Sequence, residues 1–238
     1  MNIFFQPDNT KKFLEGDEAQ HCIRALRMHP GDFLLVTDGQ GRKARARLTD
    51  VSKKECFYEI ESLEIVPPPP YTIEMAVCPT RKADRNEWMV EKMCEMGVKQ
   101  INFLVSEHTH QETIKRVVNL ERLQRIALSA MKQSRQFYLP KLNFFLSIED
   151  FFKQNLAKHR YIAYVSEKEE NKHLIEVAAS TESVAVLIGP EGDFSPSEIV
   201  KAIECGFTPV SLGETRLRTE TAAVLACHSV HLANVMQN

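Results

Sequence analysis

Two stretches near the end of the sequence place acidic, basic and glycine residues where they could bind a small charged molecule. The first is Ile188-Gly189-Pro190-Glu191-Gly192-Asp193, between an apolar run at 184–188 and the segment Ser195-Pro196-Ser197-Glu198. A serine N-cap, a proline at the first helical position and a glutamate three residues after the cap predict the start of a helix. The pattern therefore predicts a strand, a tight loop and a helix, and ligands of open α/β sheets bind at such loops. The second stretch, residues 211–222, predicts a strand end and a loop that lead into the last helix.

The charge of the ligand follows from what the first loop contains. It has neither the G-x-G-x-x-G of a dinucleotide site nor the G-K-[ST] of a phosphate loop. Glu191 and Asp193 would repel a polyphosphate. An adenosine cofactor without phosphates that carries positive charge, such as S-adenosylmethionine, fits better. The alternative is an ordinary strand-to-helix turn whose acidic residues interact with the helix dipole.

The composition sets broad limits on function. The chain has 238 residues, 43% of them hydrophobic and 26% charged, with a formal net charge of -2, so bulk charge does not point to nucleic acid. The six cysteines form no C-x-x-C pair and no secretory segment precedes them, which favours reduced thiols in the cytoplasm. The most apolar long segment, 222–236, is interrupted by polar residues, so we expect a soluble protein without a membrane span.

No metal site is predicted. His228 and His231 are three residues apart beside Cys227, but their surroundings are apolar and lack carboxylates. His108 and His110 lie two apart in a loop and give no stronger signal.

Residues 67–70, four consecutive prolines, predict a domain boundary, because a polyproline segment cannot join the interior of a sheet. Before it, apolar runs at 33–37 and 44–48 flank Asp38-Gly39-Gln40-Gly41, which predicts a hairpin, and 56–60 predicts another strand. A helix is expected at 18–28. We therefore expect a small β-barrel in residues 1–70 and a second domain in residues 71–238.

After the prolines, apolar runs alternate with segments of helix length. Strands are predicted at 72–77, 101–105, 161–165, 184–188 and 209–212, which indicates a mostly parallel sheet with helices on both faces. Asp84 predicts a helix N-cap, and Gly97 the end of that helix. The last helix, to about Met236, is apolar nearly all round, so it is either buried in its own domain or shared with a second subunit.

Basic residues gather in local clusters. Arg45 and Arg47 share one face of a predicted strand, in a segment with six basic residues against Asp50 alone. Between Lys115 and Lys141, seven basic residues face only Glu121, several of them on one side of a helix that starts near Asn119. These clusters favour an anionic polymer as partner. The alternative is that the charged side chains only keep these faces of the protein in contact with water.

Several stretches together resemble the RsmE family of ribosomal RNA methyltransferases. They are the glycine-rich loop at 188–195, the segment Leu212-Gly213-Glu214-Thr215-Arg216-Leu217-Arg218-Thr219-Glu220-Thr221-Ala222, the segment Lys82-Ala83-Asp84-Arg85-Asn86-Glu87-Trp88, residues 21–32 and Gln133-Ser134-Arg135. The resemblance implies a PUA-like β-barrel for RNA, then an α/β SPOUT methyltransferase domain with a parallel sheet and a C-terminal trefoil knot. It also implies a homodimer formed through the last helix.

The implied reaction is methyl transfer from S-adenosylmethionine to N3 of a uridine in 16S rRNA of the small ribosomal subunit. The resemblance assigns the cofactor to Ile188, Gly189, Pro190, Glu191, Gly192, Ser211, Leu212, Gly213, Leu217, Arg218 and Thr219. It points to RNA binding by Arg24, Arg27, Lys82, Arg85 and Arg135, and the basic face of the predicted strand adds Arg45 and Arg47. Asp193, Ala83, His108 and Thr215 depart from the usual family pattern.

Uracil N3 carries a proton and is a poor nucleophile until that proton is lost. The hypothesis is that Arg218 stabilises negative charge on the uracil oxygens and that Glu220 is the base or its orienting partner. Glu220 could equally serve the helix dipole. Two other functions stay open: a SPOUT enzyme that acts on tRNA, and a non-catalytic RNA-binding assembly factor.

Overall fold

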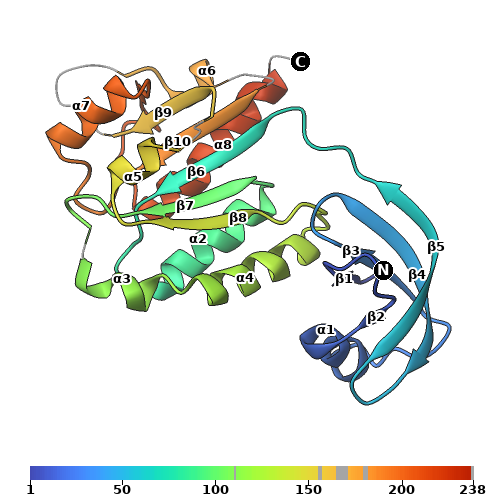
Figure 1. Cartoon of the computed structure of the whole chain (residues 1–238). Coiled ribbons are helices and arrows are strands. Elements are labelled where there is room, and N and C mark those ends of the chain that lie inside the picture. Colours follow the sequence, from blue (N-terminus) through green and yellow to red (C-terminus); the bar gives the residue numbers. More distant parts are fainter. Residues whose placement is uncertain (110, 155–156, 165–170, 179–181, 237–238) are drawn as a thin grey trace. The chain divides into compact units, whose positions relative to one another are not determined.

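The computed structural model describes residues 1–109, 111–154, 157–164, 171–178 and 182–236. The chain divides into two compact units (Figure 1). The first unit comprises Met1–Pro68 and Leu128–Leu139, and the second comprises Pro69–Ala127 and Pro140–Asn238. Sequence patterns suggested a single boundary at the prolines, whereas packing also assigns Leu128–Leu139 to the first unit.

The first unit is built on a five-stranded sheet with the order β1-β3-β4-β5-β2. Its elements are β1 (Ile3–Phe5), β2 (Phe13–Leu14), α1 (Gly16–Gln20), the π-helical turn η1 (His21–Ala25), β3 (Phe33–Thr37), β4 (Arg42–Val51) and β5 (Cys56–Ile65). The predicted hairpin is confirmed, because β3 and β4 pair antiparallel across residues 38–41. Gly39 and Gly41 make that turn with φ of 73° and 95°, values that glycine adopts without steric cost.

Alternation along β4 gives the first unit its core. Ala44, Ala46 and Leu48 are buried, while Arg45 and Arg47 point outward, as the sequence predicted. Buried Gln6, just after β1, donates from Nε2 to the carbonyl oxygen of Phe13 in β2 at 2.8 Å. This side chain links the two edge strands of the sheet, which do not pair with each other through their backbones.

The helix expected at 18–28 is shorter than predicted. Helical structure runs from Gly16 to Ala25, and Arg27 adopts a left-handed backbone with φ of 51°. The amide of Met28 then donates to the carbonyl of Cys22 at 3.1 Å, which closes the end of the π-helical turn. The apolar residues of the sequence keep a helical spacing beyond Ala25, although the backbone leaves the helical conformation at Arg27.

The second unit contains a six-stranded, all-parallel sheet with the order β11-β9-β10-β6-β7-β8. Its strands are β6 (Thr72–Val77), β7 (Gln100–Leu104), β8 (Lys141–Phe145), β9 (His159–Ala163), β10 (Ser183–Ile188) and β11 (Thr208–Val210). The predicted parallel sheet is confirmed, with each predicted strand within a few residues of an observed one. The end of the strand expected at 161–165 lies outside the described residues at Val165. No strand was predicted at β8, which lies at the edge of the sheet.

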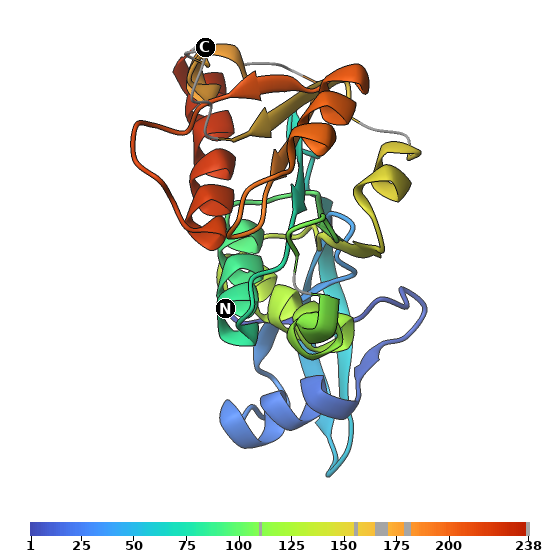
Figure 2. The same ribbon diagram turned by 90° about the vertical axis from the view of Figure 1, so that its left-hand side faces the viewer.

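Helices cover both faces of this sheet (Figure 2). The elements are α2 (Ala83–Glu95), α3 (Gln111–Val117), α4 (Leu120–Gln133), α5 (Ile148–Phe152), α6 (Leu174–Val177), α7 (Pro196–Glu204) and α8 (Thr219–Met236). On one face, α5 and α7 share an apolar cluster with strand residues such as Ala76 and Leu187. On the other, α8 packs against β6, β10 and α2. Within the described part of the chain, no helix is long and apolar enough to cross a membrane.

At the starts of two helices in this unit, α7 and α4, the sequence predicted the first residues correctly. Ser195 caps α7 in the predicted capping box: its hydroxyl accepts from the amide of Glu198, and that carboxylate accepts from the amide of Ser195. Asn119 likewise accepts from the amide of Arg122 at the start of α4. The N-cap predicted at Asp84 is wrong, because α2 begins at Ala83.

Candidate functional site

A cavity of about 890 Å³ opens at the carboxyl ends of β9, β10 and β11. Its walls are the loop after β10, the loop between β11 and α8, and the segment that leads into α6. The lining residues are Ala163, Tyr164, Asn171, Lys172, His173, Glu176, Ile188, Gly189, Pro190, Glu191, Asp193, Ser211, Leu212, Gly213, Glu214, Thr215, Arg216, Leu217, Arg218, Thr219 and Ala222. The cavity thus lies at the edge of the sheet where α/β proteins bind ligands.

Ten of the eleven residues predicted to bind the cofactor line this cavity. The exception is Gly192, which belongs to the same loop but does not line the cavity. A Cβ atom on Gly192 would lie 3.3 Å from the Cβ of His108, in the loop after β7. The predicted residues of this loop thus lie at one cavity except Gly192, which allows the loop to approach a neighbouring one.

A hydrogen bond joins the two main walls of the cavity. The hydroxyl of Thr219, at the start of α8, donates to the carbonyl oxygen of Gly189 at 3.1 Å, and both residues are buried. In the same wall as Thr219, the Ser211 hydroxyl accepts from the amide of Gly213 at 3.1 Å. Gly213 has φ of 126°, so this turn needs a residue without a side chain. These contacts fix the backbone on both sides of the cavity.

The loop after β10 explains one departure from the family pattern. Asp193 stands where a glycine is usual, and its φ of 63° is in the left-handed region that glycine adopts most easily. Aspartate tolerates this conformation better than most residues because its short side chain bonds locally. Its Oδ1 accepts from the amide of Phe194 at 2.8 Å.

A second departure, His108, contacts the first. Its Nδ1 lies 2.9 Å from the carbonyl oxygen of Asp193. This hydrogen bond raises the pKa of His108 above its usual value, because a protonated ring donates to the carbonyl. The two unusual residues thus support the same loop together.

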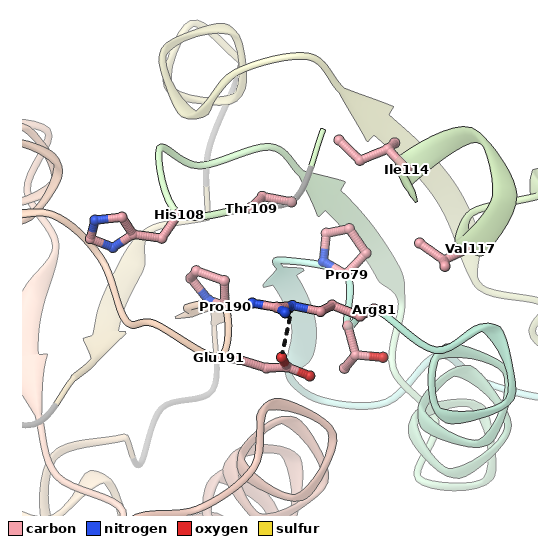
Figure 3. A pocket seen from close by; sticks show the side chains of 9 residues that line it. Pro79, Arg81, His108, Thr109, Ile114, Val117, Pro190 and Glu191 are labelled. Carbon is pink, nitrogen blue, oxygen red and sulfur yellow. Dashed lines mark ion pairs between the residues drawn. The ribbon is translucent and has the colours of Figure 1, made fainter. Parts of the chain in front are cut away.

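Glu191 faces the loop after β6 as well as the cavity. Its carboxylate pairs with Nε of Arg81 at 3.2 Å beside Pro190 (Figure 3). Both side chains also line a small second cavity of about 10 Å³, together with Pro79, His108 and Thr109. Glu191 is therefore not a free acid in this structure.

The two predicted catalytic residues lie in different environments. Arg218 is exposed, lines the cavity and has no acidic partner among the described residues. Glu220, two residues later, is buried and does not line the cavity. Its Oε1 lies 3.5 Å from Nε of Arg85 in the first turn of α2.

Buried Asn86 and Glu198 were not predicted as site residues, and both fix the loops of the site. Asn86 accepts from the amide of Thr80 at 2.8 Å and donates to the carbonyls of Thr80 and Val117, which holds the loop carrying Arg81. Glu198 accepts from the amide of Glu107 at 2.8 Å, next to His108. The capping box predicted the local role of Glu198, but no sequence signal pointed to its second contact.

Two of the predicted RNA-binding residues lie in the second unit. Lys82 is exposed immediately before α2, and Arg85 lies in the first turn of that helix.

In the first unit, Arg45 and Arg47 are half-exposed and both face Glu61, at 3.7 Å and 3.3 Å. The guanidinium of Arg45 also stacks 4.5 Å from the centre of the Phe33 ring. Glu61 of β5 thus offsets part of the positive charge on β4. The count of basic and acidic residues in 42–54 did not include β5.

The remaining predicted RNA-binding residues, Arg24, Arg27 and Arg135, are exposed. None of the three has an ion-pair partner in the described ranges. Arg27 and Arg135 both have a left-handed backbone, with φ of 51° and 59°. They end helical segments at positions where glycine is cheaper by about 1 kcal/mol.

Two of the histidines considered for a metal, His108 and His231, have other partners. Nε2 of His231 lies 2.7 Å from the Met96 carbonyl and Nδ1 lies 2.6 Å from the Tyr71 hydroxyl. His228 is exposed on α8, and His110 lies outside the described residues. Among the residues that are described, no three His, Cys, Asp or Glu side chains converge as they would around a metal ion.

The chemistry of the cavity suits a ligand with a flat apolar part and a charged tail. Ile188, Leu212 and Leu217 contribute apolar surface, and the backbone of both walls contributes peptide groups. Acidic and basic side chains both occur at its rim, and the loop lacks a phosphate-binding glycine pattern. These groups fit an adenosine with a zwitterionic, sulfonium-bearing tail.

Comparisons with known proteins agree with this geometry. Residues 67–231 match the family described as RNA methyltransferase domain, and residues 14–61 match the RNA methyltransferase PUA domain family. The chain is similar to a probable rRNA-methyltransferase from Porphyromonas gingivalis, with 39% identity, a TM-score of 0.92 and full coverage of both chains. It is similar to the putative methyltransferase Lpg2936 from Legionella pneumophila in complex with its bound cofactor SAM, with 28% identity, a TM-score of 0.84 and 97% coverage of both chains. Ribosomal RNA small subunit methyltransferase E of Rickettsia conorii is 28% identical, over 94% of this chain and 91% of its own.

Proposed function

Because this chain belongs to the RsmE family of ribosomal RNA methyltransferases, we propose that it methylates N3 of a specific uridine in 16S rRNA of the small ribosomal subunit. The methyl donor is S-adenosylmethionine, as in the related structures that contain it. Such a substrate places the protein in the cytoplasm. The observation that carries the proposal is the cavity of about 890 Å³ between the two loops.

When bound, S-adenosylmethionine supplies a methyl group on a good leaving group. The loop after β10 and the loop before α8 would hold it, through the residues predicted to bind the cofactor. The Thr219–Gly189 hydrogen bond keeps these walls at a fixed separation, which favours a defined orientation of the reacting groups.

Arg218 is the residue we assign to the substrate base. Uracil develops negative charge on its carbonyl oxygens as N3 loses its proton, and a guanidinium at the cavity can stabilise that charge. Arg218 has the required exposure and position, and no described carboxylate neutralises it. Glu220 belongs to the same assembly, either as the base, as a residue that orients another group, or in stabilising the start of α8.

The first domain, residues 1–70, would bind RNA together with basic residues of the second domain, residues 71–238. Exposed Arg24, Arg27 and Arg135 support this role better than Arg45 and Arg47, because the latter share Glu61. N3 takes part in base pairing, so the target uridine must be unpaired or turned out of its helix.

A trefoil knot in the second domain and a homodimer through α8 complete the proposal. Exposed apolar side chains on α8, Leu225, Leu232 and Val235, support the dimer because they are unusual on a solvated helix.

The test is to incubate the protein with labelled S-adenosylmethionine and either small ribosomal subunits or tRNA, and then map reverse-transcription stops. A methyl group on N3 blocks pairing, so we expect one stop in 16S rRNA. A stop in tRNA alone would show that tRNA, and not 16S rRNA, is the substrate. If calorimetry shows cofactor binding but neither RNA is labelled, the proposed activity is contradicted.

A further inference from the structure

The contact between Glu220 and Arg85 assigns a role to the carboxylate. Glu220 lies in the first turn of α8 with only 8% of its surface exposed. Its Oε1 is 3.5 Å from Nε of Arg85, whose side chain is 27% exposed. A buried carboxylate is tolerated when it is paired, and the amino end of a helix stabilises it further.

Glu220 is poorly placed to remove a proton from a base in the cavity. A general base must come within about 3 Å of the group it deprotonates, directly or through one water. Arg218, Thr219 and Ala222 all line the cavity, whereas Glu220 does not. Successive helix residues point in different directions, and Glu220 is turned toward α2 and Arg85 instead.

The pair leaves most of the Arg85 guanidinium available. The ion-pair contact is made by Nε, and neither terminal nitrogen makes a hydrogen bond in the part of the chain that the structure describes. A guanidinium held on one edge can donate two hydrogen bonds to an oxyanion from the other. Exposed Lys82, just before the same helix, adds a second positive charge.

A neighbouring ion pair shows the opposite arrangement. Arg122 contacts Glu87, also on α2, through Nε at 2.6 Å and through Nη2 at 2.9 Å. Both carboxylate oxygens of Glu87 are thus used by one guanidinium. This bidentate pair joins α4 to α2 and provides a matched control for a purely structural role.

We propose that Glu220 is a positioning residue, which holds Arg85 so that its terminal nitrogens bind a phosphate of the RNA strand beside the target uridine. This inference rests on the proposed function and goes beyond it by separating Glu220 from the proton transfer. Loss of Glu220 then weakens RNA binding through Arg85 and leaves the chemical step in place.

The experiment uses Glu220→Gln, Arg85→Ala, the double variant and the control Glu87→Gln. Methylation of small subunits gives kcat and KM over a range of pH, and calorimetry gives the cofactor Kd. For Glu220→Gln we expect KM to rise roughly five- to tenfold, kcat to stay within about threefold and the acid limb of the pH profile to persist. The double variant should be no worse than Arg85→Ala, because the two residues act as one unit. Glu87→Gln should keep the wild-type KM.

Three results would overturn the inference. They are a fall in kcat of about a hundredfold in Glu220→Gln with loss of the acid limb, multiplicative effects in the double variant, and an equal KM change in Glu87→Gln.

The single tryptophan separates failure of this inference from failure of the proposed function. Trp88 is 44% exposed and follows Arg85 by three residues on α2, so its fluorescence reports RNA binding without turnover. If the wild type binds RNA but transfers no methyl group, the activity is wrong. The positioning role is still decided by whether Glu220→Gln and Arg85→Ala weaken the fluorescence titration equally.

Discussion

The two ends of α8 have opposite surroundings. At its start, Arg218 is exposed at the cavity and Thr219 holds the facing loop. Toward its end, partly buried His231 is fixed between the Tyr71 hydroxyl and the Met96 carbonyl. Beside the first end, Arg218 lines a space that a ligand can fill. The other has its polar groups satisfied inside the protein.

We therefore expect residues at the start of α8 to contribute mainly to ligand binding and residues toward its end to contribute mainly to stability. Substitution of exposed Arg218, just before α8, should change activity with little effect on folding, because its side chain lines the cavity and is open to ligand and solvent. His231 should do the reverse, because its partners lose a hydrogen bond that nothing replaces. Variants at each end test whether this division holds.

The largest effect is expected for Arg218→Ala. Removing a cation that stabilises developing negative charge typically lowers kcat about a hundredfold or more. The cofactor Kd by calorimetry and the melting temperature should change little. Arg216→Ala, in the same exposed segment, is the control and should keep most of the activity. Near-normal turnover in Arg218→Ala would sink the assignment.

The next effect is expected for His231→Ala, and it concerns stability. The substitution leaves the Tyr71 hydroxyl and the Met96 carbonyl without their partner, which costs about 2 kcal/mol. For a protein of this size the melting temperature should fall by roughly 5 °C. The kcat of the folded enzyme should not change. Exposed His228→Ala is the control, and an equal loss of stability there would show that the buried contacts are unimportant.

A smaller effect is expected for Thr219→Val at the other end of the helix. Valine keeps the shape but cannot donate to the buried carbonyl of Gly189, so the two walls are no longer joined. The cofactor Kd should rise about tenfold, equivalent to roughly 1.4 kcal/mol. Thr219→Ser keeps the hydroxyl and should bind normally. Equal affinity of the valine variant would mean that the walls are fixed by packing alone.

Sequence reasoning succeeded where signals were local. The strand before Gly189, the capping box at Ser195 and the end of β11 each depend on residues within one turn or one strand. Because parallel strands place their carboxyl ends on one edge, correct local elements also brought the two loops together. Most of the fold and ten of the lining residues of the cavity were therefore predictable, whereas the wall formed by the segment before α6 was not.

Contacts between distant segments were not predictable in the same way. The sequence left Glu220 open as a base, as an orienting partner or as a residue of the helix start, and its contact with Arg85, far away in the sequence, was not predictable. The sequence predicted a cationic face at Arg45 and Arg47, whereas the structure places Glu61 of β5 beside them. Side-chain partners across strands and helices depend on register and packing, which a single sequence does not encode locally.

The smallest expected effect is a dependence of stability on pH with opposite signs for two histidines. Burial lowers the pKa of His231 below its usual value, against a smaller opposing effect of the Met96 carbonyl. The unfolded chain then binds more protons, so the contribution of His231 is present above about pH 6.5 and is lost as the pH falls toward the folded value.

For His108, the hydrogen bond to the Asp193 carbonyl raises the pKa, so its contribution is present below about pH 6.5 and is lost as the pH rises through the folded value. Melting temperatures between pH 5 and pH 8 for the wild type, His231→Ala and His108→Ala should show this. Relative to the wild type, His231→Ala should be destabilised less at pH 5 than at pH 8, and exposed His108→Ala should show a weak trend in the opposite direction. Parallel curves for all three proteins would contradict the lowered pKa assigned to partly buried His231 near the far end of α8.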